Sequence, residues 1–243
     1  MKRATFDAIQ TARAGKIPIA LVVNLSDGAE ALVTATTVDG ALSDEIVAEA
    51  RARLRDSKSG VVERGGGRWF VDCHNPPLRV IVVGAVHITQ TLVPMAAVAG
   101  YEVVVIDPRA SFATQERFPN VQLMDDWPDE AMEALAPDRR TAVITLTHDP
   151  KLDDPALHVA LRSEAFYIAC LGSRRTHASR LDRLRAEGFD DDTLARIHGP
   201  AGLPIGAVSP AEIALSVLAE MTAVLHEVPP PMKSANTNTA SAA

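Results

Sequence analysis

The fold of this chain is decided by the stretch Arg79-Val80-Ile81-Val82-Val83-Gly84-Ala85-Val86-His87. Residues 79–83 predict a strand, and their apolar run is typical of a strand that is buried on both faces of a parallel sheet. Gly84 permits a tight turn after that strand, and a helix-like pattern follows over residues 87–99. A buried strand that turns directly into a helix opens a βαβ unit, so the stretch predicts an α/β fold.

Strands and helices continue to alternate along the rest of this region. The last helix has a clear start signal, because Ser209-Pro210-Ala211-Glu212 combines a capping box with proline at the first helical position. The helix after the fourth strand is expected to begin at Asp154-Pro155. Residues 78–228 are therefore predicted to form a Rossmann-like doubly wound parallel sheet. Its further strands are expected at residues 102–106, 121–124, 141–146 and 165–171.

The region before this sheet has a different pattern and predicts a small α+β N-terminal domain over residues 1–75. Two runs rich in β-branched residues, 17–25 and 31–38, predict strands. Gly65-Gly66-Gly67 predicts a hairpin turn, and a phosphate-binding loop is disfavoured there because no helix start follows. Asn75-Pro76-Pro77 cannot continue a sheet ladder and is expected to link the two domains.

Composition argues against several classes of function. The chain has 243 residues, of which 47% are hydrophobic and 23% charged, the balance of an ordinary globular protein. Its net charge of −7 argues against non-specific binding to nucleic acid. No stretch approaches the ~20 apolar residues that span a bilayer, and the N-terminus has no pattern of a secretory signal. Residues 229–243 begin with three prolines, are then rich in Ser, Asn, Thr and Ala, and are expected to form a disordered tail.

The two cysteines, Cys73 and Cys170, belong neither to a CxxC pair nor to a Cys/His pattern with zinc spacing. The simpler interpretation is two reduced thiols in a cytosolic protein, one of them buried at the end of a strand. The alternative, a thiolate in contact with a metal or sulfur centre, stays open. No metal ligands are assigned from the sequence.

Ligands of doubly wound sheets bind outside the carboxyl ends of the strands, near a topological switch point. After the first strand, a dinucleotide fingerprint needs glycine at positions 84, 86 and 89, and only Gly84 is present. Val86 instead puts a β-branched side chain where a pyrophosphate would approach, which disfavours tight NAD binding. Asp107 lies 23 residues after Gly84, in the position that binds a ribose hydroxyl. A nucleotide site and a purely structural turn both stay open, and His87 either contacts a ligand or packs against the turn.

Two further loops carry candidate residues. Asp107 and Arg109, at the end of the second strand, would either bind ribose and phosphate together or pair with each other. Thr147-His148-Asp149 follows the fourth strand, where its polar groups are placed to meet a ligand or a metal. Asp149-Pro150 also ends that strand, so a structural role is the alternative.

The loop after the fifth strand, Cys170-Leu171-Gly172-Ser173-Arg174-Arg175-Thr176-His177, predicts an anion-binding site. Its glycine permits close backbone approach, and its serine or threonine can cap the helix that follows. Free backbone N–H groups at a helix start, together with Arg174 and Arg175, favour a bound anion. The alternative is a capped helix with solvated arginines. The later arginines of this helix are expected to face solvent: Arg180, Arg183 and Arg185.

Several separated motifs occur in a characteristic order within residues 78–226. They are Gly84-Ala85-Val86-His87, Thr147-His148-Asp149, Ala169-Cys170-Leu171-Gly172-Ser173-Arg174-Arg175-Thr176, Arg196-Ile197-His198-Gly199-Pro200 and Ser209-Pro210-Ala211-Glu212-Ile213-Ala214. In this order they resemble the XdhC/CoxI family, the accessory factors of xanthine dehydrogenase and related molybdenum hydroxylases. Val86 departs from the Gly-Ala-Gly-His turn of that family.

The resemblance implies a homodimeric cytoplasmic chaperone and not an enzyme. Its cargo would be the molybdenum cofactor, as molybdopterin or as its cytidine dinucleotide form, which it would shield during sulfuration and insert into an apo molybdenum hydroxylase. A cysteine desulfurase or a cytidylyltransferase would be a further partner. The predicted anion site suits this cargo, because the cargo carries phosphate. An NAD(P)-dependent oxidoreductase or a nucleotide-binding regulator is the alternative that the same fold permits.

The loops and the resemblance together assign nine residues to cofactor binding. They are Gly84, His87, Asp107, Arg109, His148, Gly172, Ser173, Arg174 and Arg175. Relatives in the family carry a Gly-Gly-Cys stretch before their first long helix, where this chain has Leu42-Ser43-Asp44-Glu45. If that thiol assists sulfur or molybdenum handling in relatives, this chain either does without it or uses Cys73 or Cys170.

Overall fold

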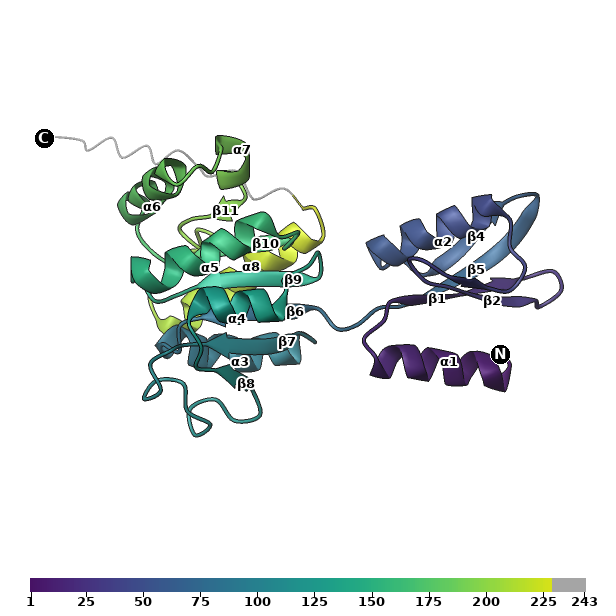
Figure 1. The fold of residues 1–243 in the computed structure, drawn as a ribbon, viewed down its shortest axis with the longest axis horizontal. Helices are drawn as coiled ribbons and strands as arrows, with labels where there is room; N and C mark the ends of the chain where they lie inside the picture. The colour runs from purple at the N-terminus through teal and green to yellow at the C-terminus, as the bar shows by residue number, and fades with distance from the viewer. Residues whose placement is uncertain (229–243) are drawn as a thin grey trace, which may run out of the picture. The chain divides into compact units, whose positions relative to one another are not determined.

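The computed structural model describes residues 1–228. The chain divides into two compact units, one over Met1–Pro76 and a second that begins at Pro77 (Figure 1). The tail expected at residues 229–243 lies outside the described residues. Among residues 1–228, none of the helices has the length and apolar character that a membrane span requires.

The N-terminal unit is an antiparallel sheet with one helix on each face (Figure 1). Its elements are α1 (Arg3–Ala14), β1 (Ile19–Asn24), β2 (Glu30–Val33), β3 (Val38–Asp39), α2 (Asp44–Asp56), β4 (Gly60–Arg64) and β5 (Gly67–His74). The strand order is β3-β2-β1-β5-β4. Successive side chains of a strand point to opposite faces. Val22 of β1 therefore packs in one core cluster with Ile46 of α2, while Leu21 packs in another with Ile9 of α1.

The glycines between β4 and β5 have the backbone that a two-residue hairpin turn needs. The two strands pair antiparallel with Arg64 opposite Gly67, which leaves Gly65 and Gly66 as the turn. Both glycines have positive φ, +56° and +71°. A type I′ turn requires such values, and glycine adopts them without a Cβ clash. The predicted hairpin is confirmed.

The second unit is a parallel sheet with helices on both faces (Figure 1). Its elements are β6 (Arg79–Val83), α3 (His87–Val98), β7 (Glu102–Ile106), β8 (Gln122–Met124), α4 (Pro128–Leu135), β9 (Thr141–Thr145), α5 (Pro150–Arg162), β10 (Tyr167–Cys170), α6 (Arg174–Ala186), α7 (Asp191–Leu194), β11 (Ile197–His198) and α8 (Pro210–Leu225). The strand order is β11-β10-β9-β6-β7-β8. This order confirms the predicted Rossmann-like doubly wound sheet, and its direction reverses between β6 and β9, which makes that pair the topological switch point.

The side chains of β6 alternate between two core clusters, one on each face of the sheet. Val82 is fully buried in the cluster that contains Leu92 of α3 and part of α8. Ile81 is fully buried in the cluster that contains Leu157 of α5 and part of α4. Because both faces are covered, an apolar residue is favoured at every position of the strand, as the sequence of this stretch predicts.

One helix start was predicted wrongly, and three short elements were not predicted. The helix α5 begins at Pro150 and not at Asp154. Asp149-Pro150 is an equally good start signal, and the Asp149 carboxylate accepts a hydrogen bond from the backbone N–H of Lys151 at 3.0 Å. Pro155 consequently lies inside the helix. The helices α4 and α7 and the strand β11 are too short for a periodic pattern to indicate them.

Candidate anion-binding site

The strands β6 and β9 are neighbours in the sheet, and a glycine lets the loops that follow them approach closely. Gly84 follows β6 with φ of +113°. A Cβ atom at this position would lie 2.8 Å from Cγ2 and 3.2 Å from the backbone N of Thr147, the residue before His148. Both the backbone conformation and the available space therefore require glycine here. The switch point brings these two candidate loops together.

Asp107, at the end of β7, is fully buried and binds its own chain. Its Oδ2 accepts a hydrogen bond from the Ala85 backbone N–H at 2.8 Å. Arg109 donates from Nε to Oδ1 at 2.8 Å and from Nη2 to Oδ2 at 2.7 Å. Burial raises the pKa of Asp107, but the hydrogen bonds from Arg109 and Ala85 outweigh burial and hold the pKa below its ordinary value. Asp107 and Arg109 therefore pair with each other, which was one of the two alternatives. Ribose binding by Asp107 stays a prediction.

The helix α6 begins with the predicted cap. Gly172 precedes it with φ of +144°, and a Cβ atom there would lie 3.2 Å from the side chain of Thr176. Ser173 is the N-cap residue, and its Oγ accepts a hydrogen bond from the backbone N–H of Thr176 at 3.1 Å. Arg174 and Arg175 are the first two helical residues, whose backbone N–H groups have no acceptor within a helix. The start of α6 thus carries free donors and the positive end of the helix dipole.

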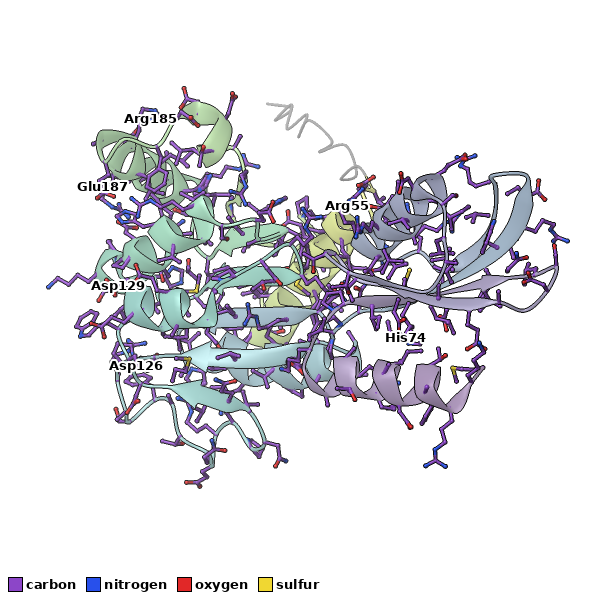
Figure 2. The ribbon with its side chains drawn as sticks, turned by 45° about the vertical axis from the view of Figure 1, so that its right-hand side comes forward. Arg55, His74, Asp126, Asp129, Arg185 and Glu187 are labelled. Carbon is purple, nitrogen blue, oxygen red and sulfur yellow. The ribbon has the colours of Figure 1, made fainter. Side chains whose placement is uncertain are left out.

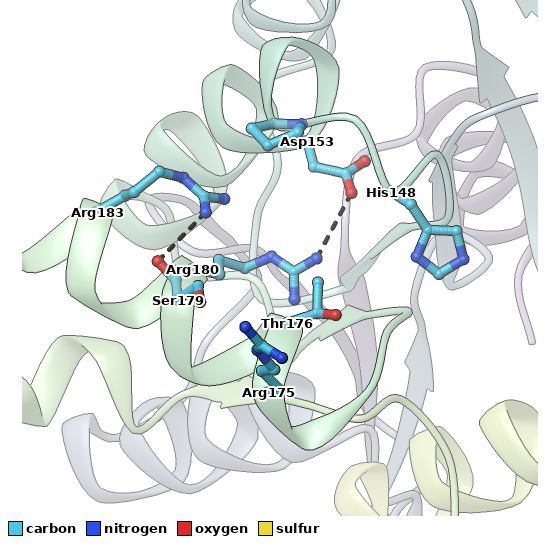
Figure 3. A pocket seen from close by; sticks show the side chains of 8 residues that line it. His148, Asp153, Arg175, Thr176, Ser179, Arg180 and Arg183 are labelled. Atoms are coloured by element: carbon cyan, nitrogen blue, oxygen red, sulfur yellow. Dashed lines mark hydrogen bonds and ion pairs between the residues drawn. The ribbon is translucent and has the colours of Figure 1, made fainter.

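A pocket of about 250 Å³ lies between the start of α5 and one side of α6 (Figure 3). Its lining residues are His148, Pro150, Asp153, Arg175, Thr176, Ser179, Arg180 and Arg183. The lining residues from α6 recur three or four positions apart, the spacing of one helical face. One wall of the pocket is therefore rich in arginine, and the loop after β9 with the first turn of α5 forms the opposite wall.

Arg180 is buried at the centre of this pocket, so the expectation that it faces solvent is wrong. Its relative exposure is 2%. Its Nη2 donates a hydrogen bond to the carbonyl oxygen of Leu171 at 3.1 Å and lies 3.6 Å from Oδ2 of Asp153. Its Nε and Nη1 are buried without a hydrogen-bond partner among the described residues. The face of α6 that carries Arg180 packs against α5, where the Asp153 carboxylate partly offsets the cost of burying a cation.

The other two arginines of this helix are partly exposed and paired. Arg183 donates to both carboxylate oxygens of Asp154, at 2.7 Å and 3.0 Å. Arg185, near the C-terminal end of α6, lies at the surface (Figure 2) and pairs with Asp182 and Asp191. Their charges are balanced within the chain.

Asp153 and His148 belong to the wall opposite the arginines. The Oδ1 atom of buried Asp153 accepts a hydrogen bond from Oγ1 of Thr147 at 2.7 Å, while its Oδ2 has no hydrogen-bond partner among the described residues. Burial raises the pKa of this carboxyl, and the hydrogen bond from Thr147 and the charge of Arg180 do not fully offset it. His148 has a left-handed backbone with φ of +63°, which is uncommon for residues other than glycine. Its imidazole lines the pocket.

The predicted site residues separate into three groups. Those at the pocket or at the adjoining helix start are His148, Gly172, Ser173 and Arg175. Those beneath the first turn are Gly84, Asp107 and Arg109. His87 and Arg174 are exposed and do not line the pocket. The role of each in cofactor binding stays a prediction.

Reasoning from the sequence missed two residues at the centre of the pocket, Asp153 and Arg180. One signal could have indicated them. Asp153-Asp154 puts two adjacent acids in a segment with apolar neighbours, and buried acids need partners such as the arginines of the next helix.

Within the described residues, the pocket has neither a cluster of metal-ligating side chains nor a reactive cysteine. Among residues 1–228, His, Cys, Asp and Glu side chains form no group of three or more that could hold a metal ion. Cys170 is fully buried, and burial raises its pKa to about 12. A thiol with this pKa is neutral near pH 7. The interpretation of Cys170 as a metal- or sulfur-binding thiolate is therefore disfavoured.

A doubly wound parallel sheet with a cationic pocket at the carboxyl edge of its strands defines a Rossmann-type ligand-binding domain. Comparison with protein families makes the assignment specific. The chain belongs to the XdhC family, because the model of the XdhC Rossmann domain matches residues 80–221. The resemblance inferred from the ordered motifs is confirmed.

Known proteins are similar over the same region. The chain is 32% identical over 153 residues to the molybdenum cofactor insertion chaperone PaoD of Escherichia coli (strain K12), a match that covers 63% of this chain and 42% of PaoD. It is 31% identical over 153 residues to a probable xanthine dehydrogenase subunit from Bacillus subtilis (strain 168), covering 63% of this chain and 44% of that protein. The chain thus spans less than half the length of the curated relatives that it matches. A crystal structure of a xanthine dehydrogenase from Bacillus halodurans has the same fold, with a TM-score of 0.70 at 23% identity, over 97% of this chain and 67% of that one.

Proposed function

We propose that this protein is a chaperone that binds the molybdenum cofactor as cargo and inserts it into an apo molybdenum hydroxylase of the xanthine dehydrogenase type. The observation that carries this function is the cationic pocket around Arg180 in a chain of the XdhC family. The name of PaoD, a molybdenum cofactor insertion chaperone, supports it. The cofactor is carried without turnover.

The chemistry of the pocket suits an anionic cargo. Arg175 and Arg180 supply positive charge, and the start of α6 supplies backbone N–H donors. Gly84 lets the loops after β6 and β9 pack closely beside this region, which helps to hold His148 at the pocket. The bound cofactor itself would supply the molybdenum centre. The residues of this chain attract, orient and shield it.

The remaining parts of the proposed role are the assembly and the partners. We propose a homodimer that acts in the cytoplasm, with a cysteine desulfurase or a cytidylyltransferase as a further partner. These assignments rest on the resemblance to the XdhC/CoxI family. The thiol route for sulfuration does not use Cys170, because that side chain is buried and neutral.

Direct binding of the cofactor tests this function. The full chain is mixed anaerobically with molybdenum cofactor released from a molybdoenzyme and is then separated by gel filtration. We expect pterin to elute with the protein and to be detected by fluorescence after oxidation. Elution of protein without pterin, together with binding of NADH, would instead support the NAD(P)-dependent alternative.

A pair of neighbouring arginines provides a matched control for this experiment. Arg175→Ala removes a cation that lines the pocket, whereas Arg174→Ala removes one that does not. We expect Arg175→Ala to weaken cofactor binding about tenfold, the loss of one charge-assisted contact, and Arg174→Ala to weaken it less. Both side chains are exposed, so neither change should unfold the protein. Equal affinities for wild type and Arg175→Ala would remove the pocket from the cofactor site.

A further inference from the structure

Buried Arg180 offers hydrogen-bond donors that the described chain does not use. Its side chain is 3% exposed, yet Nε and Nη1 have no hydrogen-bond partner among residues 1–228. The carboxylate of Asp153 lies 3.6 Å from Nη2, beyond hydrogen-bond distance, so this ion pair does not satisfy the guanidinium. Leaving buried charged donors unpaired costs free energy of folding, and an oxygen atom of a bound ligand would recover this cost. Figure 3 shows the guanidinium in the pocket between Asp153 and Arg175.

Asp153 adds an unused acceptor to the same pocket. Its Oδ1 accepts a hydrogen bond from the Thr147 hydroxyl, while its buried Oδ2 has no hydrogen bond within the described part of the chain. An anion that enters beside this oxygen meets a negative charge unless one proton lies between them. The pocket therefore combines donors that favour an oxyanion with an acceptor that selects for an oxyanion able to share a proton.

We infer that the pocket between α5 and α6 is a subsite for a phosphate group, free or as a phosphomonoester, which binds Arg180 and Arg175 and shares a proton with Asp153. Phosphate suits this arrangement because its second pKa of about 6 lets it keep or share a proton near neutral pH. Sulfate has the same shape but no proton to share. The identity of the physiological ligand rests on the proposed function, in which this group is the terminal phosphate of molybdopterin.

The size and charge of the pocket agree with one phosphate group. Its volume of about 250 Å³ is below the ~300–1,000 Å³ of pockets that enclose a whole small-molecule ligand. Arg183 is neutralised by Asp154, which leaves Arg175 and Arg180 against Asp153, an excess of one positive charge. The pocket thus fits the phosphate end of a larger ligand.

Calorimetric titration of the full chain with inorganic phosphate and with sulfate, at one pH and ionic strength, tests this subsite. We expect wild type to bind phosphate about tenfold more tightly than sulfate, because sulfate leaves the Asp153 acceptor facing an unprotonated anion. Asp153→Asn removes that negative charge and supplies an N–H donor. We expect the Asp153→Asn variant to bind sulfate more tightly than wild type does, so that its affinities for phosphate and sulfate become similar. Phenyl phosphate, a monoester, should bind with an affinity similar to that of inorganic phosphate.

Two arginine variants complete the test. Arg175→Gln should lower the affinities for phosphate and for sulfate about equally. Arg185→Gln removes one positive charge from the far end of the same helix and should change neither affinity. Circular dichroism verifies that each variant is folded, and Arg175 is exposed, so its variant keeps the test valid if Asp153→Asn fails to fold. Equal binding of both anions by wild type, or no binding of phosphate, would overturn the subsite. If the cofactor is still retained in that case, the chaperone function stands and only the place of its phosphate is wrong.

Discussion

Single glycines set how closely the loops of the site approach each other. At Gly84, φ of +113° and a Cβ position 2.8 Å from Thr147 Cγ2 both exclude a larger residue. We expect Gly84→Ala to lower the free energy of unfolding by about 2–4 kcal/mol, the sum of a strained backbone and an overpacked contact. Chemical denaturation measures this loss.

Gly188→Ala is the matched control for that change. Gly188 also has a positive φ, +100°, but no atom of the described residues lies within 4 Å of its Cβ position. It should therefore lose only the backbone contribution, about 1–2 kcal/mol. If the two variants lose equal stability, the contact between Gly84 and Thr147 is not what requires glycine.

Among the elements, α8 packs on the sheet through apolar residues and is also linked to it by the partly buried carboxylate of Glu220. Glu220 of α8 accepts a hydrogen bond from the Tyr167 hydroxyl of β10 at 2.6 Å and from the Gly202 backbone N–H at 2.9 Å. Its other oxygen lies 3.4 Å from Nδ1 of His198 in β11. Burial raises the pKa of Glu220, but the hydrogen bonds from His198, Tyr167 and Gly202 outweigh it, so the pKa lies below its ordinary value.

This lowered pKa predicts how stability depends on pH. The Glu220 carboxylate stabilises the fold at any pH above its unfolded-state pKa of about 4.3, and this contribution is lost as the pH falls through the folded-state pKa. We expect Glu220→Gln to cost about 1–2 kcal/mol at pH 7 and the difference from wild type to shrink below about pH 4. Denaturation at several pH values tests this. The exposed Glu116→Gln serves as the control and should cost little at any pH.

In the whole molecule, the two units have separate cores. Among the described residues, each core cluster draws its members from one unit alone. Ile46 and Ile144 are buried in the first and second unit, with exposures of 1% and 0%. We expect Ile46→Val and Ile144→Val each to cost about 0.5–1.5 kcal/mol. Hydrogen exchange followed by mass spectrometry should show faster amide exchange only in the unit that carries the change.

The same pair of variants also tests the proposed domain division, because each serves as the control for the other. Faster exchange across both units in either variant would mean that the chain unfolds as one cooperative structure. The boundary near Pro76 and Pro77 would then connect two parts of a single domain.

Local patterns predicted most of the fold. The apolar run at β6 predicted a strand buried on both faces, and the capping box at Ser209 and Glu212 forms both of its expected hydrogen bonds. The start of α5 was predicted wrongly at Asp154-Pro155, because Asp149-Pro150 carries the same signal five residues earlier. A local signal that occurs twice cannot select one start, and the choice depends on where the preceding strand ends.

Most strands and helices of the second unit, and the turns at Gly84 and Gly172, could be predicted because periodicity, caps and turn glycines act between neighbours in the chain. The ordered motifs also carried the resemblance to the XdhC family. The pocket, in contrast, depends on how α5 and α6 pack against each other in space. This packing turned Arg180, expected in solvent, into a buried cation beside Asp153. The direction and burial of a long side chain depend on the element packed against it, and here that element is α5, which lies far from Arg180 in the sequence and beside it in space.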